Sequence, residues 1–396
     1  MVFKKIILFF LLLAPGFLYS QNFNWITPGK TYIKLYITED GMYRIDRNDF
    51  LNTGVNPSTI DPRTVKLFFK GNQVPLFFQG EDDGVFNDND FFDFYGIRNS
   101  GGLTPYRNGF TNTIAYTVDE YYNLYSDTSA YFIDWGGANG NRYSVFTNSS
   151  SLSFPQNFTS KSIHREVDFK YYLGETTNPN SDYRYFNTEL AVGEGWFWKE
   201  MKSQSDSVIV DNFLVENLNP NGNASIRVNA YPNSILPNFP NEHKIQLRIN
   251  SIIVDTVEAN DYTRIDTTIS FPANILVNGN NNIYIRYLSP SNATEVYLNY
   301  NYYRITYNTA FSFINNKFSF NLTGSDSTLR QFKISSASVS NPVYIYDVNN
   351  FRKIQNNSFS SDTLIFSGNS NSKFEIYNTN NLKKPAKIRQ RIVPNL

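Results

Sequence analysis

Cysteine is absent from this 396-residue chain, and histidine occurs only twice, as His164 and His243. Without cysteine, these residues contain no disulfides, no thiolate metal ligands and no cysteine nucleophile. They also contain no cysteine that could carry a lipid anchor. The two histidines are far apart in the sequence, and neither lies near a serine nucleophile motif, so we expect both to be structural or surface residues. The chain as given is therefore predicted not to be an enzyme.

Charge is also scarce. Charged residues make up 18% of the chain, and 35 Lys and Arg balance 35 Asp and Glu. Nucleic acids and acidic membranes need a concentrated positive field, so neither is expected as a partner. Aromatic residues reach 17%, which indicates packed cores rather than disorder. At roughly 100–200 residues per domain, the length allows two to four domains.

Long apolar runs are missing except near the N-terminus. There, Lys4 and Lys5 precede an unbroken apolar stretch over residues 6–13. This pattern predicts a secretory signal peptide cleaved after Ser20. A membrane anchor is the alternative, but the stretch is short for a hydrocarbon core of about 30 Å. We expect export to the periplasm, the cell surface or the medium, with no transmembrane span.

Helical periodicity is hard to find, whereas short alternating runs rich in β-forming residues recur along the chain. This pattern predicts an all-β, multidomain fold with only short helical turns. The first domain is expected to contain two hairpins, 32–37 with 42–45 and 65–69 with 74–78, and a short helix over 48–51 capped by Asn48 or Asp46.

Polar loops and changes in the strand pattern divide the chain. A polar stretch covers 147–153, regular alternation begins at Ser207, and a further set of strands begins near Phe311. The final residues are basic, and they form either a solvated tail or a connector. The expected units are a signal peptide (1–20), an N-terminal prodomain-like β domain (21–150), a connecting segment (151–206), a jelly-roll-like β-sandwich (207–310), a small β domain (311–380) and a connector to a missing downstream domain (381–396).

Seven segments, in this order, resemble one family: 32–34, 39–45 (EDGMYRI), 60–62, 65–71, 84–96, 123–132 and 193–196. Together they are similar to the region before the protease domain of gingipain-like cysteine peptidases, which the type IX secretion system of Bacteroidetes-type bacteria exports. The sortase of that system is a more distant resemblance. Residues 384–386 (KPA) resemble the lead-in to the peptidase domain.

The resemblance implies a non-catalytic N-terminal portion that assists the folding, export or positioning of a protease domain. Catalysis in that family needs a cysteine and a histidine in an α/β domain, and neither the cysteine nor such a domain is present. The implied partners are a downstream or associated peptidase domain and the secretion machinery. The alternative is a stand-alone exported binding protein whose β-sandwich binds carbohydrate or protein. An enzyme of unrecognised type is a third hypothesis.

The strongest chemical pattern is an acidic, amide-rich loop over residues 81–90. Closely spaced carboxylates and amides are the ligands that Ca²⁺ needs, although the spacing is not that of an EF-hand. The alternative is a turn that uses these side chains for local hydrogen bonds. The candidate calcium ligands are Asp82, Asp83, Asn87, Asp88 and Asp90; no other cofactor is predicted.

Aromatic residues suggest two further sites. Glu194 beside Trp196 and Trp198 is compatible with sugar chemistry, but a glycosidase needs a second carboxyl roughly 5–10 Å away. We expect Trp196 to Trp198 to pack in a core or at a domain junction instead. The tyrosine-rich run over 297–303 should fill the sandwich with one face, and its other face is a candidate surface for sugar or protein.

Overall fold

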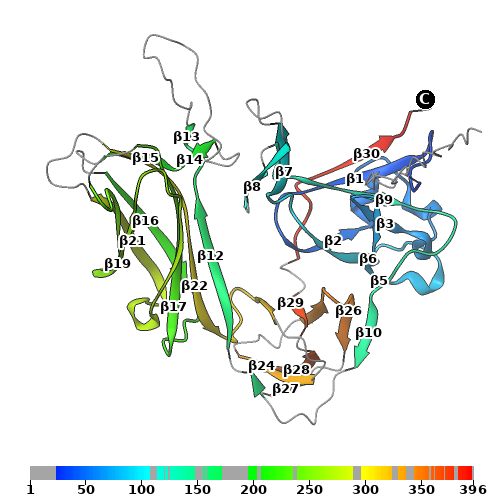
Figure 1. Ribbon diagram of the computed structural model, residues 1–396. Coiled ribbons are helices and arrows are strands. Elements are labelled where there is room, and N and C mark those ends of the chain that lie inside the picture. The colour runs from blue at the N-terminus through cyan, green and yellow to red at the C-terminus, as the bar shows by residue number, and fades with distance from the viewer. Residues whose placement is uncertain are drawn as a thin grey trace, which may run out of the picture.

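Strands dominate the molecule (Figure 1), which confirms the all-β prediction. The computed structural model describes residues 24–107, 114–119, 121–123, 125–147, 155–156, 158–171, 195–202, 207–234, 239–288, 296–322, 329–335, 343–355, 358–360, 362–369, 371–378 and 382–394. The predicted signal peptide lies outside these ranges. Within them, no helix is long and apolar enough to cross a membrane.

The N-terminal domain consists of two sheets that enclose one core. The apolar residues of both sheets face each other, including Leu35, Ile45, Leu67, Phe92 and Ile133. The first sheet has the order β30 (Lys387–Ile392), β1 (Thr31–Ile37), β9 (Ser129–Asp134), β3 (Lys66–Phe69), β4 (Asn72–Val74), and the second has the order β2 (Gly41–Asp46), β6 (Phe91–Gly96), β5 (Phe77–Gln79).

Short elements complete this domain. Helix α1 (Arg47–Leu51) begins at the predicted place, with Asp46 as its N-cap and a capping box to Asp49. The remaining elements are the hairpin β7 (Gly102–Arg107) and β8 (Ile114–Asp119) and the 3-10 turns η1 (Pro57–Thr59), η2 (Pro62–Thr64) and η3 (Glu81–Asp83).

One predicted hairpin is confirmed in part and the other is wrong. Lys70 and Gly71, both at positive φ, join β3 to β4 as a two-residue turn. The predicted second strand of this hairpin, 74–78, is divided: Val74 ends β4, whereas Phe77 and Phe78 belong to β5 of the other sheet. The turn at Gly41 does not pair β1 with β2, because β1 pairs with β9 and β30 while β2 pairs with β6. The chain steps there from one sheet to the other, so that both strands bury apolar residues in the same core.

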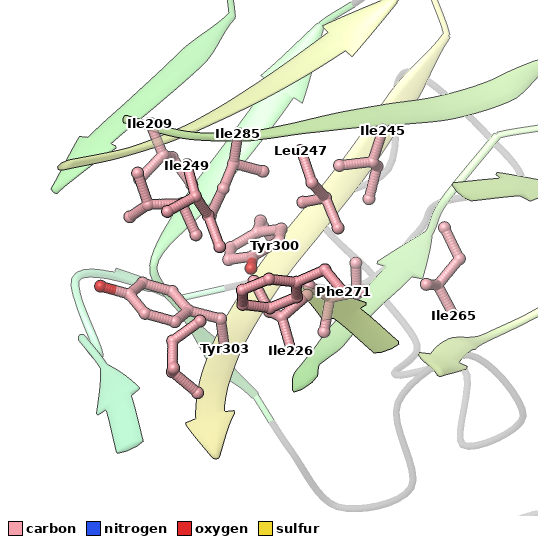
Figure 2. Close-up of a cluster of buried hydrophobic side chains, with 14 of the residues drawn as sticks. Ile209, Ile226, Ile245, Leu247, Ile249, Ile265, Phe271, Ile285, Tyr300 and Tyr303 are labelled. Atoms are coloured by element: carbon pink, nitrogen blue, oxygen red, sulfur yellow. The ribbon is translucent and has the colours of Figure 1, made fainter. Parts of the chain in front are cut away.

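The β-sandwich buries the alternate residues of two antiparallel sheets. Figure 2 shows Ile226, Tyr300 and Tyr303 from one sheet against Ile209 and Ile285 from the other. One sheet has β12 (Phe158–Glu166), β22 (Tyr297–Ala310), β17 (Asn223–Pro232) and β20 (Ile265–Pro272), with β15 (Lys199–Lys202) on β22; the other has β16 (Val208–Val215), β21 (Gly279–Leu288), β18 (His243–Ile249) and β19 (Ile252–Ala259). The short pair β13 (Lys170–Tyr171) and β14 (Trp196–Phe197) and the turn η4 (Ala273–Ile275) complete it.

The small β domain has a phenylalanine core. The rings of Phe320, Phe332, Phe366 and Phe374 lie with centroids 5.1–6.4 Å apart, and a Cβ on Gly368 would overlap Phe374. Its sheets are β10 (Ser144–Thr147), β26 (Arg352–Gln355), β25 (Val343–Asp347), β29 (Lys373–Asn378), β23 (Lys317–Asn321), and β11 (Pro155–Gln156), β24 (Leu329–Ile334), β28 (Thr363–Asn369), β27 (Ser358–Ser360).

The chain visits these domains in a nested order (Figure 1). From the N-terminal domain it contributes β10 and β11 to the small domain, builds the sandwich, completes the small domain, and returns as β30 to the N-terminal domain. Strand β10 therefore belongs to the small domain rather than to the predicted N-terminal unit (21–150). Strands β12 and β15 belong to the sandwich rather than to the predicted connecting segment (151–206). These assignments rest on pairings such as Val145 with Lys353, which local alternation does not reveal.

Candidate functional site

Residues 382–394 are the last described segment of the chain and are here called the exit segment. Its strand β30 pairs with β1 over six residues, from Thr31 with Ile392 to Tyr36 with Lys387. Before β30, the Lys383 N–H donates to the Met42 carbonyl at 2.9 Å, and the Lys383 carbonyl accepts from the Arg44 N–H at 3.0 Å. The basic end of the sequence is thus an edge strand rather than a solvated tail.

Lys384 fixes the exit segment to helix α1. Its Nζ donates to Asp46 Oδ2 at 2.7 Å and to Asp49 Oδ2 at 2.6 Å. Burial alone would lower the pKa of Lys384, but the hydrogen bonds to the two carboxylates raise it above its ordinary value. Because these carboxylates also form the capping box of α1, one lysine ties the exit segment to the start of the helix.

A buried charged cluster joins the N-terminal domain to the small domain. Arg44 on β2 donates to Asp93 on β6 through Nε and Nη2, at 2.8 and 2.7 Å, and the Asp93 side chain is fully buried. The hydroxyl of Tyr346, on β25 of the small domain, donates to Asp93 Oδ2 at 2.6 Å. We call Arg44, Asp93 and Tyr346 the domain anchor.

Neither the anchor nor the function of Lys384 was predicted from the sequence. Arg44 and Asp93 lie within the segments that carried the family resemblance, but nothing local distinguishes them from exposed charges. The sequence feature that could have revealed the anchor is a charged residue among apolar neighbours on each of two strands. Charged side chains are buried only when they are paired, so two such residues are candidates for a buried ion pair.

A second contact joins the N-terminal domain to the sandwich. The ring of Tyr121 stacks on His164 of β12, with centroids 4.1 Å apart, and His164 Nε2 lies 2.7 Å from Glu166 Oε2. The guanidinium of Arg98 also lies over the Tyr121 ring, with its carbon 4.0 Å from the ring centroid. His164 is therefore part of a domain contact.

His243 is a structural residue inside the sandwich. The side chain is fully buried, with Nδ1 2.6 Å from the Tyr287 hydroxyl and Nε2 3.0 Å from the Ser234 carbonyl. Because a carbonyl only accepts, Nε2 carries the proton and Nδ1 accepts from the tyrosine. Burial lowers the pKa of His243, which favours the neutral ring.

The acidic loop over 81–90 uses its side chains in local hydrogen bonds. Asp83 accepts from the Val85 N–H and from Asn87 Nδ2, and Asp90 accepts from the Asn87 N–H at 2.7 Å. Burial raises the pKa of Asp90. Asp88 is exposed and lies 3.2 Å from Arg47.

In the part of the chain that the structure describes, no three acidic, histidine or cysteine side chains are grouped as metal ligands. The loop brings Asp83, Asn87 and Asp90 together, Asp88 pairs with Arg47, and Asp82 forms no hydrogen bond with these described side chains. The calcium site stays a prediction, which isothermal titration of the chain with Ca²⁺ tests.

The predicted aromatic site divides between core and surface. Phe197 is fully buried, and Trp198 stacks on Tyr303 at 6.0 Å in the sandwich core. Trp196 is 45% exposed and packs on Tyr171. Glu194 lies outside the described residues. Along the tyrosine run, residues 298–303 are buried, so β22 offers no open tyrosine face there.

Comparison with known proteins identifies a fold relative. The chain matches no family model and no curated protein sequence. Its fold is similar to the crystal structure of dimeric latent PorU from Porphyromonas gingivalis, with a TM-score of 0.65 at 14% identity. The alignment covers 92% of this chain and 33% of the PorU chain, so the chain spans about a third of that protein's length.

Other solved structures share much less with the chain. The alignment with a β-porphyranase of glycoside hydrolase family 86 from Bacteroides plebeius covers 72% of this chain and 35% of the porphyranase chain. The identity is 12% and the TM-score is 0.22. VP2 of infectious bursal disease virus covers 92% of this chain and 64% of its own at 8% identity, with the same TM-score. Such low scores carry no argument, whereas the likeness to PorU shows a shared fold.

Proposed function

We propose that this chain is the non-catalytic front module of a longer exported protein, similar in organisation to the gingipain-like peptidases and to PorU. The observation that carries the proposal is the exit segment. It follows the last strand of the small domain and pairs with β1, the first strand of the module. A domain that followed residue 394 would start beside residues 29–31, in a position that the N-terminal domain determines.

This arrangement supports a function in folding and positioning. The N-terminal domain lacks its edge strand until the exit segment has been made, because β30 comes from the last part of the chain. The module would therefore close only when all three domains are present, and a following domain would emerge from a completed support. Association with a peptidase domain or with the secretion machinery is part of the proposal, as is export through the N-terminal signal peptide.

The direct test is to sequence the gene beyond the codon for Leu396 and to measure the mass of the exported product in the source organism. We expect the reading frame to continue into a domain that contains cysteine and histidine, and a product longer than 396 residues. A stop codon directly after Leu396, with a product of matching mass, would overturn the proposal.

One observation favours a second candidate, an exported binding protein. The outer face of the sandwich carries a hollow of about 540 Å³ over β16, β18 and β21. Its walls are Val208, Val210, Gln246, Arg248, Tyr284 and Arg286, and Arg248 stacks on Tyr284 at 4.0 Å. Affinity electrophoresis in gels that contain soluble polysaccharides tests it. Retardation that Tyr284→Ala abolishes would support a sugar site, and unchanged mobility in every gel would remove the sugar hypothesis.

A further inference from the structure

A cavity of about 380 Å³ lies against the first sheet of the N-terminal domain. Its lining includes the segment before β1, residues of β1, β9 and β30, and the turn between β3 and β4. The volume is within the range of about 300–1,000 Å³ that is usual for small-molecule sites. Because the exit segment supplies part of the wall, the cavity is complete only when β30 is paired with β1 (Figure 1).

The wall of this cavity is mainly apolar. Four aromatic residues line it: Trp25, Tyr32, Phe69 and Phe132. The Trp25 ring stacks on Phe68, with ring centroids 4.7 Å apart, and its centroid lies 5.3 Å from that of Phe132. The apolar body of a ligand would leave water and contact these rings, which favours binding.

Hydrogen bonds fix the segment before β1. The Tyr32 hydroxyl donates to the Trp25 carbonyl at 3.0 Å and accepts from the Thr27 N–H at 2.8 Å. The Gly29 N–H donates to the Val393 carbonyl at 2.8 Å. These bonds hold Trp25 and Val393, which both line the cavity, in defined positions. The site is therefore preformed, which lowers the cost of ordering it around a ligand.

The charged groups of the wall are positive. Lys70 and Arg391 line the cavity, and no Asp or Glu is among its described lining residues. The described contacts of both cations are with neutral groups: Arg391 Nη2 lies 3.4 Å from the Tyr36 hydroxyl, and Lys70 Nζ lies 5.2 Å from the centroid of the Phe69 ring. An anion in the cavity would therefore meet two cations and no carboxylate of the described lining. The planar fork of an arginine matches a carboxylate in particular.

We propose that this cavity binds a small carboxylic acid with an apolar body, of the aryl-aliphatic class. The body would lie against the rings of Trp25 and Phe132, and the carboxylate would bind Arg391, with Lys70 adding to the positive field. Burial of apolar surface would supply most of the affinity, and the cations would select an anion over a neutral molecule. The site needs the paired exit segment but no domain after residue 394, so it is independent of the proposed function in positioning a following domain.

The experiment is isothermal titration calorimetry of the exported chain (residues 21–396) with 4-phenylbutyrate. The matched ligand is 4-phenylbutan-1-ol, which keeps the apolar body and carries no charge. Arg391→Gln removes a cation of the site. Arg389→Gln is the matched control, because Arg389 is also exposed on β30 but does not line the cavity. Ala130→Phe adds a ring to the β9 part of the wall and should fill part of the cavity.

We expect saturable binding of 4-phenylbutyrate and at least about tenfold weaker binding of the alcohol, which lacks charge-assisted hydrogen bonds. Arg391→Gln should weaken binding of the acid at least about tenfold and leave binding of the alcohol within about threefold, since only the acid uses the guanidinium. Arg389→Gln should bind both ligands within about threefold of the unaltered chain, because salt screens a distant exposed charge. Ala130→Phe should weaken binding of both ligands.

Four outcomes would overturn the proposal. They are absence of binding, equal affinity for the acid and the alcohol, equal losses in Arg391→Gln and Arg389→Gln, and unchanged binding by folded Ala130→Phe. The two arginine variants keep the test decisive even if Ala130→Phe fails to fold, because both arginines are exposed on an edge strand.

Discussion

Replacing Arg44 by methionine tests the domain anchor. The substitution keeps most of the apolar stem and removes the guanidinium, whose carbon lies 3.4 Å from the Phe91 ring centroid and which donates two hydrogen bonds to Asp93. Asp93 would then stay fully buried with the Tyr346 hydroxyl as its remaining donor among the three anchor residues. Breaking a buried ion pair in this way costs about 3–5 kcal/mol of folding free energy.

The companion variant Tyr346→Phe removes one hydrogen bond to a charged acceptor, which costs about 1.5–3 kcal/mol. Arg227→Met is the matched control, because Arg227 pairs with Asp266 on the sandwich and both side chains are about a quarter exposed. An exposed pair of this kind contributes about 1 kcal/mol or less. The three variants should therefore rank in the order Arg44→Met, Tyr346→Phe, Arg227→Met.

Denaturant unfolding measures the loss of folding free energy, and hydrogen exchange of the native protein shows which domain has lost stability. For Arg44→Met, strands β2, β6 and β25 should lose protection, while β17 and β21 of the sandwich keep theirs. A loss below about 1 kcal/mol, or an equal loss of protection in the sandwich, would refute the assignment of Arg44 and Asp93 as the anchor between the N-terminal and small domains.

Three further outcomes follow from single residues. Burial lowers the pKa of His243 below 6.5. Near that pH the folded sandwich therefore binds fewer protons than the unfolded chain, and it loses stability as the pH falls below 6.5. The unfolding temperature of His243→Gln should not show this decline. Burial raises the pKa of Glu375 above 4.5, so stability falls as the pH rises above 4.5, and Glu375→Gln should show a higher unfolding temperature than the unaltered chain at pH 8. Gly80 has φ +91° and a Cβ there would overlap Asp90, so Gly80→Ala should cost at least about 1 kcal/mol in denaturant unfolding, whereas Gly102→Ala, with open space around it, should change little.

Local patterns in the sequence predicted the strands well and their partners poorly. The runs at 32–37, 42–45 and 318–320 are strands as expected, because alternating apolar residues and β-branched or aromatic side chains act over a few residues. The pairing of β1 with β30 joins residues more than 350 positions apart. No local sequence pattern indicates such a contact. The fold can still form it, because the entropic cost of closing a loop grows only slowly with loop length.

The exit segment was missed for a second reason. Strand β30 is an edge strand whose side chains are largely exposed, so it lacks the alternation that marks a half-buried strand. Its lysines and arginines resemble a solvated tail, and charged residues of this kind are common on edge strands. The anchor residues were missed because burial of a charge depends on a partner that only the tertiary fold supplies.

The most direct test of the exit segment uses the absence of cysteine from the chain. Thr31 pairs with Ile392 in the register of β1 and β30, whereas Lys387 pairs with Tyr36, five residues further along β1. Mild oxidation of Thr31→Cys/Ile392→Cys should therefore give an intramolecular disulfide, seen by mass spectrometry. Thr31→Cys/Lys387→Cys should not, since five residues of strand separate the two sites by roughly 16 Å. Equal cross-linking of both variants, or none in the first, would contradict the account of a module closed by its own exit segment.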